Sequence, residues 1–288
     1  MSSNSTSIDY AEAFGIHSVP AAAIFAIIYA PLLVYYIFRL VTKFNYVFIV
    51  MTLFCLFRTV GFVIRAVVAG STSAGSNLSL VIADQVLFGI GFSGLLFATF
   101  SLQNDRERVA GLHYKTPPMS ILTNGRIFHL VVAGSVALLV VGTSKLTSHG
   151  PGDQSTGNTL RTAGTWVLFG ATLIPGIRAG AFMYLKSTKY QHVGMKMNSF
   201  VDQNAAAILC VITALLVERM VYSVITVGMQ ASEASYYPLS ALPEFLVVCV
   251  FATPGLVLSR TELQEQDVIL EGYRPNERLY DPHTQIHA

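Results

Sequence analysis

The sequence predicts an all-α integral membrane protein, a bundle of seven transmembrane helices. Of its 288 residues, 53% are hydrophobic and only 12% are charged, whereas soluble domains carry about 25% charged residues. Seven apolar runs are each long enough to cross a bilayer as a helix, which takes about 20 residues. The basic residues concentrate in alternate connecting segments, a distribution typical of membrane proteins with a defined orientation.

The seven apolar runs are expected to be helices rather than strands. In lipid, a helix satisfies its backbone hydrogen bonds within one segment. A membrane β-barrel would show alternating segments of about 10 residues, which the sequence lacks. The expected spans, which together make one bundle over residues 18–258, are Ser18–Leu40, Tyr46–Gly70, Leu78–Leu102, Ile127–Leu146, Thr162–Leu185, Asn204–Met229 and Tyr237–Leu258.

The charges of the connecting segments predict the orientation. Residues 1–17 are polar without Lys or Arg, so they lack the basic start of a cleaved signal peptide, and we expect them outside the cytoplasm. The outer segments then hold only Lys145 and Arg161 against twelve cytoplasmic basic residues, a strong positive-inside signal. We expect a multi-pass protein of the plasma membrane with a cytoplasmic tail, residues 259–288. The twelve are Arg39, Lys43, Arg106, Arg108, Lys115, Arg126, Lys186, Lys189, Lys196, Arg260, Arg274 and Arg278.

Two outer segments carry further expectations. Asn4 begins an Asn-Ser-Thr sequon and is a candidate for N-glycosylation, in agreement with an exported N-terminal segment. The segment Thr147–Arg161 is rich in Gly, Ser and Thr. We expect it to form a flexible loop between the fourth and fifth spans.

The two halves of the chain resemble each other. Arg58–Ile64 in the second span and Arg219–Ile225 in the sixth share Arg, Val, Val and Ile at equal offsets. Asp84 follows Arg58 by 26 residues, and Glu244 follows Arg219 by 25. This pattern predicts a parallel internal repeat of three spans, one linking span and three spans. Chance similarity of apolar segments is the alternative.

Charged residues at membrane depth are the candidate site. Each costs at least a few kcal/mol there, so such residues usually face the bundle interior and pair. Depth favours Asp84 as the partner of Arg65, and Glu244 as the partner of Arg219. These charges either line a cavity in the outer half that binds a ligand, a lipid headgroup or an ion, or clamp the helices together; both readings stay open. The candidate cavity residues are Arg58, Arg65, Asp84, Glu218, Arg219 and Glu244.

The inner end of the third span carries a second candidate feature. Asp105, Arg106 and Glu107 resemble the acid–Arg motif of rhodopsin-like receptors and are candidates for coupling to a cytoplasmic signalling partner. Arg178 lies about two turns from the inner face, and we expect its long side chain to reach the headgroups.

The sequence favours neither an enzyme nor a metal or cofactor site, and we name no catalytic residue. His129 is the only His inside a predicted span, whereas a zinc site takes several converging ligands. Asp84 and Glu244 could serve as an acid–base pair, but each has an Arg candidate, so we prefer ion pairing. Gly89–Gly94 fits GxGxxG but lies within a span, which argues against nucleotide binding. No nucleic-acid partner is expected.

Two stretches suggest relatives. Leu53–Arg58 and Ile82–Gly89 resemble fungal seven-span proteins that are often labelled family C-like G-protein-coupled receptors. The pattern Arg58-x-x-Gly-Phe-x-x-Arg65, with Arg219 followed by Glu244, is more distantly similar to the fungal lipid-translocating exporter family. The resemblance covers roughly residues 18–260 and implies a seven-span protein without an established catalytic residue.

Two functions are therefore expected. The first is a receptor-like sensor that binds an unknown small molecule or lipid in the outer cavity and signals to a cytoplasmic partner. The second is a lipid or amphiphile transporter that handles a headgroup with the same charges. The acid–Arg motif and the short loops favour the receptor slightly, while the repeat favours transport, because many transporters are built from repeated bundles.

Overall fold

The computed structural model describes residues 15–110, 124–146, 151–189, 200–229, 232–258 and 264. Seven helices within these ranges are long and apolar enough to cross a membrane, and the described residues contain no strand. The predicted all-α, seven-helix membrane bundle is therefore confirmed. The long helices are α2 (Val19–Thr42), α3 (Tyr46–Gly70), α5 (Leu78–Val109), α7 (Gly125–Leu146), α8 (Pro151–Lys189), α9 (Phe200–Thr226) and, preceded by two short elements, α11 (Leu242–Phe251).

Most helix ends agree with the predicted spans, and α8 is the main exception. α3 has the predicted bounds, and α9 is displaced by only three or four residues. α8 begins at Pro151 rather than Thr162, so most of the segment expected to be a flexible loop is helical, and this expectation is wrong. Proline fits the first turn of a helix because it needs no N–H donor there. At about 1.5 Å per residue, α8 exceeds the ~30 Å hydrocarbon core and extends beyond it.

The seventh span consists of three successive elements rather than one helix. α10 (Glu233–Tyr236) is followed by a π-helical turn, η1 (Tyr237–Ala241), and then by α11. Pro243 lies just after the π-turn and has no N–H to donate to the carbonyl four residues earlier. The N–H of Leu242 instead donates to the carbonyl of Tyr237, which widens the turn. α11 ends at Phe251, seven residues before the predicted end.

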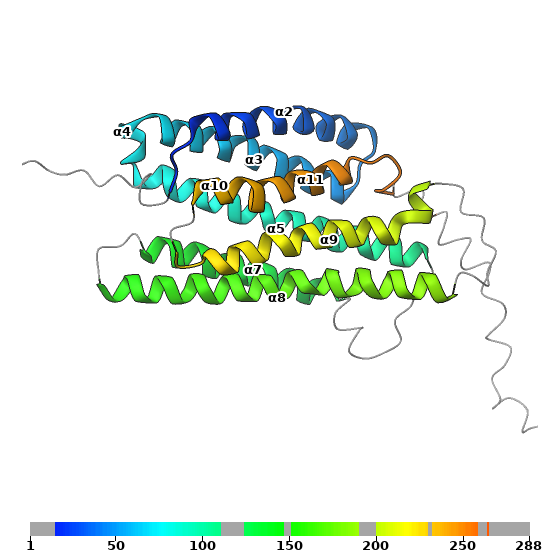
Figure 1. Cartoon of the computed structure of the whole chain (residues 1–288). Coiled ribbons are helices and arrows are strands. Elements are labelled where there is room, and N and C mark those ends of the chain that lie inside the picture. Colours follow the sequence, from blue (N-terminus) through cyan, green and yellow to red (C-terminus); the bar gives the residue numbers. More distant parts are fainter. Residues whose placement is uncertain are drawn as a thin grey trace, which may run out of the picture.

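α5 occupies the centre of the bundle (Figure 1). It packs against α3, α7, α8 and α9, whereas the outer helices pack mainly on their neighbours in the chain. Two tyrosines connect α2 with the seventh span. Tyr36 Oη donates to the carbonyl of Val248 at 2.7 Å, and Tyr35 Oη donates to that of Ala252 at 2.8 Å. The first and seventh spans therefore lie side by side.

The two ends of the bundle are named here for use below. At the α10 end, α2 begins, and the Glu233 carboxylate accepts hydrogen bonds from the backbone N–H groups of His17 and Ser18. At the Gly255 end, α5 ends, and Asn45 donates to the carbonyl of Leu258. In Figure 1 the α10 end is on the left.

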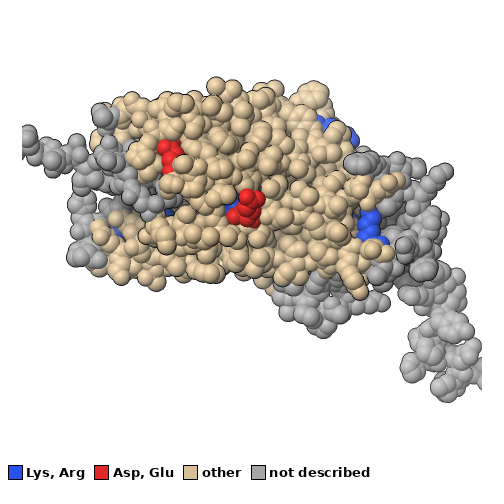
Figure 2. Space-filling model, viewed as in Figure 1, with Lys and Arg blue, Asp and Glu red and all other residues tan. Residues whose placement is uncertain are grey.

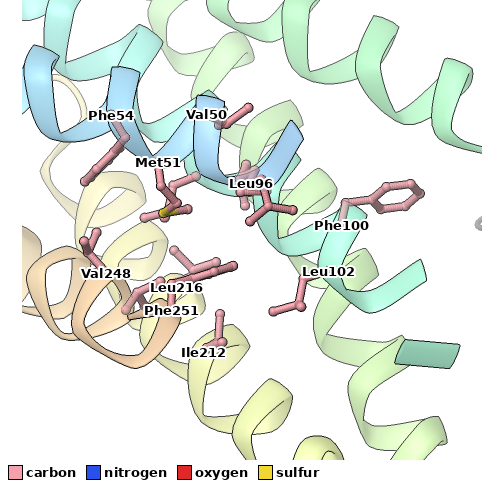
Figure 3. Packing of buried hydrophobic residues seen from close by; sticks show 14 of the residues in the cluster. Val50, Met51, Phe54, Leu96, Phe100, Leu102, Ile212, Leu216, Val248 and Phe251 are labelled. Atoms are coloured by element: carbon pink, nitrogen blue, oxygen red, sulfur yellow. The ribbon is translucent and has the colours of Figure 1, made fainter. Parts of the chain in front are cut away.

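The long sides of the bundle are apolar, as a lipid-facing surface requires. Large hydrophobic side chains such as Ile27 and Val41 are exposed there, and Figure 2 shows few charged side chains along this face. Inside, apolar residues from α3, α5, α9 and α11 pack together (Figure 3), among them Met51, Leu96 and Leu216. This buried layer separates the two ends of the bundle.

Glycines bring α7 and α8 into close contact. A Cβ added at Gly142 would lie 2.8 Å from both Cγ and the backbone N of Arg161, and one at Gly164 would lie 2.9 Å from the carbonyl of Ser135. Such small residues let membrane helices approach closely. The stem of Arg161 is thereby fixed against α7.

Candidate functional site

Three arginines and two acids form an ion-pair cluster between α3, α5, α9 and α11, toward the α10 end. Glu244 of α11 bridges two of them: its Oε2 lies 2.5 Å from Arg58 Nη2, and its Oε1 lies 2.8 Å from Arg219 Nε. Arg65 Nη2 donates to Asp84 Oδ2 at 2.9 Å. The predicted pairs Arg65–Asp84 and Arg219–Glu244 are both confirmed, and the structure adds Arg58 to the second pair.

The ion pairs do not follow the proposed internal repeat. The repeat makes Arg58 equivalent to Arg219, and Asp84 equivalent to Glu244. Arg219 contacts its expected acid, but Arg58 contacts Glu244 across the bundle, while Asp84 pairs with Arg65. The repeat therefore stays a prediction from the sequence.

Aromatic rings stabilise the arginines of the cluster. Phe88 lies between two of them, with its ring centre 4.4 Å from Arg58 Cζ and 4.7 Å from Arg65 Cζ. The Phe92 ring lies 3.9 Å from Arg219 Cζ. Such cation–π contacts contribute about 2 kcal/mol when the cation is desolvated. They help to hold guanidinium groups for which the cluster has too few carboxylates.

The cluster leaves donors without acceptors. Three arginines face two carboxylates, and Arg58 is fully buried. In the described part of the chain, Arg58 Nε, Arg58 Nη1 and Arg65 Nε have no hydrogen-bond partner, against one acceptor, Asp84 Oδ1, that also has none. A buried donor without a partner costs roughly 1–3 kcal/mol, and more when charged. The cluster therefore favours the approach of an additional acceptor.

A cavity of about 540 Å³ lies at the α10 end of this cluster. Its walls come from α3, α5, α7, α8, α9 and the start of the seventh span, and they include Arg65 and Arg219. The volume lies in the ~300–1,000 Å³ range of small-molecule sites. The predicted polar cavity thus exists within the described residues, and two of its six predicted members line it. Arg58, Asp84 and Glu244 are buried beside it.

Arg161 is a cavity residue that the sequence reasoning missed. Its side chain lines the cavity from α8, although it was expected in a loop. α8 continues toward its N-terminus past Thr162. Arg161 therefore lies on this helix, one residue before the predicted start of the span.

One predicted cavity member lies elsewhere. Glu218 is exposed on α9 and does not line the cavity, so its assignment to the cavity is wrong. Neighbouring residues on a helix point in directions about 100° apart, so with Arg219 facing the bundle interior, Glu218 faces outward. Asn4 lies outside the described residues.

A second group of charges lies at the Gly255 end. Arg106 of α5 contacts Asp202 of α9 at 2.6 Å, donates to the carbonyl of Leu256 at 2.6 Å and also to that of Gly255. It is only 3% exposed. The structure therefore places Arg106 in a buried contact between helices rather than on a free surface, and Asp105 beside it is partly buried.

Glu107 completes this group by contacting α8. Arg178 Nη2 lies 2.5 Å from Glu107 Oε2 and donates to Asn104 Oδ1 at 2.6 Å. Arg178 has no exposed surface, so the expectation that it reaches the headgroups is wrong. Its level matches that of Glu107 because α5 continues to Val109, beyond the predicted end of the third span.

The described residues place no group of three or more His, Cys, Asp or Glu where it could hold a metal ion. The charged groups that the structure brings together beside the cavity are guanidinium and carboxylate groups. No curated protein and no solved structure matches the chain. The family described as "Domain of unknown function (DUF7702)" matches residues 19–261. Since this match spans all seven membrane helices, the chain belongs to the DUF7702 family.

Proposed function

We propose that this protein is a receptor-like sensor in the membrane. A small-molecule or lipid ligand binds in the cavity at the α10 end and changes the packing at the Gly255 end, where a cytoplasmic partner recognises the change. The positive-inside distribution of the loops supports this orientation, with the α10 end outside.

The observation that carries the proposal is the path of α5. Near its start, Gln85, Phe88 and Gly89 line the cavity. Near its end, Arg106 and Glu107 hold α9, α8 and the backbone after α11. From Gly89 to Arg106 is about 25 Å at 1.5 Å per residue. A small displacement of α5 by a ligand therefore acts directly on the contacts at the other end.

The contacts at the Gly255 end are of a kind that can switch between a formed and a separated arrangement. Arg106–Asp202 and Arg178–Glu107 are ion pairs at short distance, and Lys186 adds two hydrogen bonds to carbonyls at the start of α9. A shift of helices by 1–2 Å, the size seen in known switches, would separate such pairs. The inner surface of the bundle would then change.

Spin-label distances test the sensor. Labels at Thr42→Cys on α2 and Ser187→Cys on α8 occupy exposed sites at the Gly255 end; the three native cysteines, Cys55, Cys210 and Cys249, are replaced by Ala. The labelled full chain is placed in nanodiscs of dioleoylphosphatidylcholine, with and without total lipid extract of the expression host. We expect the extract to shift the distance by about 2 Å or more. An identical distribution in both would overturn the proposal.

Matched glycine variants connect the shift to the cavity. A Cβ at Gly89, which lines the cavity, meets nothing within 4 Å, and the same holds for the exposed Gly170 on α8. Gly89→Leu therefore adds bulk at the cavity wall with a Cβ that meets no neighbour, and Gly170→Leu adds the same bulk outside the cavity. We expect the distance shift to disappear in the first variant and to persist in the second.

Transport of a lipid or amphiphile is the second candidate. It is favoured by the mixed lining of the cavity, where the arginines share the wall with Leu139 and Val140 of α7. A transporter must move its cargo across the membrane, whereas a sensor need not. Rapid transbilayer movement of a fluorescent phosphatidylcholine in proteoliposomes, lost in Gly89→Leu but not in Gly170→Leu, would favour the transporter.

A further inference from the structure

The side chain of Arg161 presents a cation to the cavity that has no acidic partner among the described residues. It is partly buried on α8, and its stem packs at Gly142 of α7. Among the described residues its guanidinium makes no ion pair and no hydrogen bond, and its backbone carbonyl accepts from Thr165. A guanidinium carries five N–H donors in a planar fork that fits phosphate and carboxylate oxygens. Arg161 is thus fixed in place with its donors unused.

Other donors with unused capacity line the same cavity. Arg65 is 6% exposed and its Nε has no hydrogen-bond partner within the described ranges. The Tyr222 hydroxyl is buried and also without a partner there. Arg219 uses Nε for Glu244 and Nη1 for the sulfur of Met220. The cavity therefore presents donors from α3, α8 and α9, and an acceptor group is what they lack.

Each acidic group around the cavity already contacts a donor, although Asp84 Oδ1 has no hydrogen-bond partner among the described residues. Glu233 is the acidic residue of the lining, and its oxygens accept from the N–H groups of His17 and Ser18 and from the hydroxyl of Tyr237. Asp84 and Glu244 each contact an arginine of the cluster. Counting the cluster and the lining together, four arginines face three carboxylates. Among the described residues of the cluster and the lining, one positive charge is therefore unbalanced, and an anionic ligand would balance it.

One wall of the cavity is apolar. Val136, Leu139 and Val140 of α7 and Leu168 of α8 line it. These side chains offer nothing to a charged group, but they fit a hydrocarbon chain. The cavity thus combines arginines with apolar side chains in one lining, and an amphiphile matches both features.

We propose that the cavity binds an amphiphile with a phosphate or carboxylate headgroup, which Arg161, Arg219 and Arg65 hold while the apolar wall of α7 covers the start of its tail. This inference rests on the proposed ligand-binding role of the cavity and names the chemical class of the ligand. The headgroup supplies the missing negative charge. It could belong to a phospholipid of the bilayer or to a free fatty acid.

Native mass spectrometry of the full chain in a non-ionic detergent tests the proposal. The protein is titrated with dioleoyl phosphatidic acid, with dioleoylphosphatidylcholine, which has the same tails, and with oleate. We expect one phosphatidic acid to bind at least about tenfold more tightly than phosphatidylcholine, since charge-assisted hydrogen bonds to arginine carry the difference. Tighter binding of oleate than of phosphatidic acid would identify a fatty acid as the source of the headgroup. Equal affinity for all three would overturn the anionic class.

Variants of Arg161 locate the binding. Arg161→Gln keeps the Cγ that packs at Gly142 and removes the charge, so the fold is expected to persist. It should lower the affinity for phosphatidic acid about tenfold, and Arg161→Lys should restore part of it, because lysine keeps the charge but not the planar fork. The matched control is Arg126→Gln on α7, an exposed arginine outside the cavity. Equal effects of Arg161→Gln and Arg126→Gln would overturn the site.

Competition with inorganic phosphate tests whether the ligand needs an apolar tail. We expect inorganic phosphate, at the same concentration as phosphatidic acid, not to displace it, because the tail contributes to binding. Displacement would show that the cavity takes a free anion and would overturn the amphiphile. If the protein binds phosphatidic acid selectively but the spin-label distance does not shift, the sensor proposal is overturned and the anion site is retained. If the spin-label distance shifts but phosphatidic acid binds no more tightly than phosphatidylcholine, only the anion site is overturned.

Discussion

Arg58 of α3 and Glu244 of α11 form a fully desolvated ion pair across the bundle, with 2.5 Å between Nη2 and Oε2. Both side chains are at most 2% exposed. The same carboxylate also holds Arg219 of α9. Glu244 therefore supplies the negative charge for one arginine on each of two helices, α3 and α9.

Replacing Glu244 by Gln should destabilise the bundle severely. The change leaves two buried arginines without their carboxylate, and the loss of one partner of a buried pair costs about 3–5 kcal/mol. Unfolding of the purified protein by SDS in mixed micelles measures the free energy. The matched control is Glu218→Gln on the exposed face of α9, which we expect to change stability by less than about 0.5 kcal/mol. Equal losses in the two variants would contradict this account of the cluster.

The pair between Arg178 and Glu107 should show strong coupling. Both side chains are buried, so Arg178→Met and Glu107→Met each remove one half of this ion pair. The double variant removes both charges and should be more stable than the sum of the single losses predicts. We expect a coupling energy of about 1–3 kcal/mol in a double-mutant cycle of unfolding free energies. Additive losses would mean that the two charges do not interact.

Gly142→Ala should separate α7 from α8. The new methyl group would lie 2.8 Å from Arg161 and 2.9 Å from the carbonyl of Gly157, and overpacking of this kind costs about 1–3 kcal/mol. Gly134→Ala on the same helix meets nothing within 4 Å and serves as the control. The midpoint of thermal unfolding in detergent should fall in the first variant alone. A stable Gly142→Ala protein would argue against the close contact.

Arg106→Ala should loosen the backbone after α11. Arg106 donates to the carbonyls of Gly255 and Leu256, where the chain turns with a φ of 82° at Gly255. Hydrogen–deuterium exchange of a peptide covering residues 252–258 should become faster. Arg108→Ala, on the exposed side of α5, should leave this exchange unchanged. Unchanged exchange in both variants would mean that the turn at Gly255 does not depend on Arg106 for its stability.

The helices and part of the cluster could be predicted from the sequence because membrane burial imposes simple rules. A run of about 20 apolar residues has one stable conformation in lipid, which explains the agreement for α3. Charges at equal depth pair, which explains Arg65 with Asp84. Depth alone could not show that Arg58 crosses to Glu244, because that contact depends on how α3 and α11 face each other.

The errors arose where helices extend beyond their apolar part. α5 and α8 continue past the ends of their hydrophobic runs, so Glu107 and Arg161 lie on helices beyond the predicted spans. Arg178 lies within its predicted span but contacts Glu107 rather than the headgroups. Hydropathy ends where polar residues begin, but a helix ends where its backbone hydrogen bonds stop. Glu218 was misplaced for another reason, because depth gives no information on helix rotation.

The π-turn before α11 has a consequence for comparing DUF7702 sequences. The wide turn holds one more residue than an α-helical turn between the same two helical segments. A one-residue deletion within Tyr237–Ala241 would therefore let the turn close into an ordinary α-helix, and Glu244 would keep facing Arg58 and Arg219. The same deletion within a regular α-helix would rotate the residues after it by about 100°. A one-residue gap in an alignment of this family is therefore compatible with an intact ion-pair cluster when it falls at this turn.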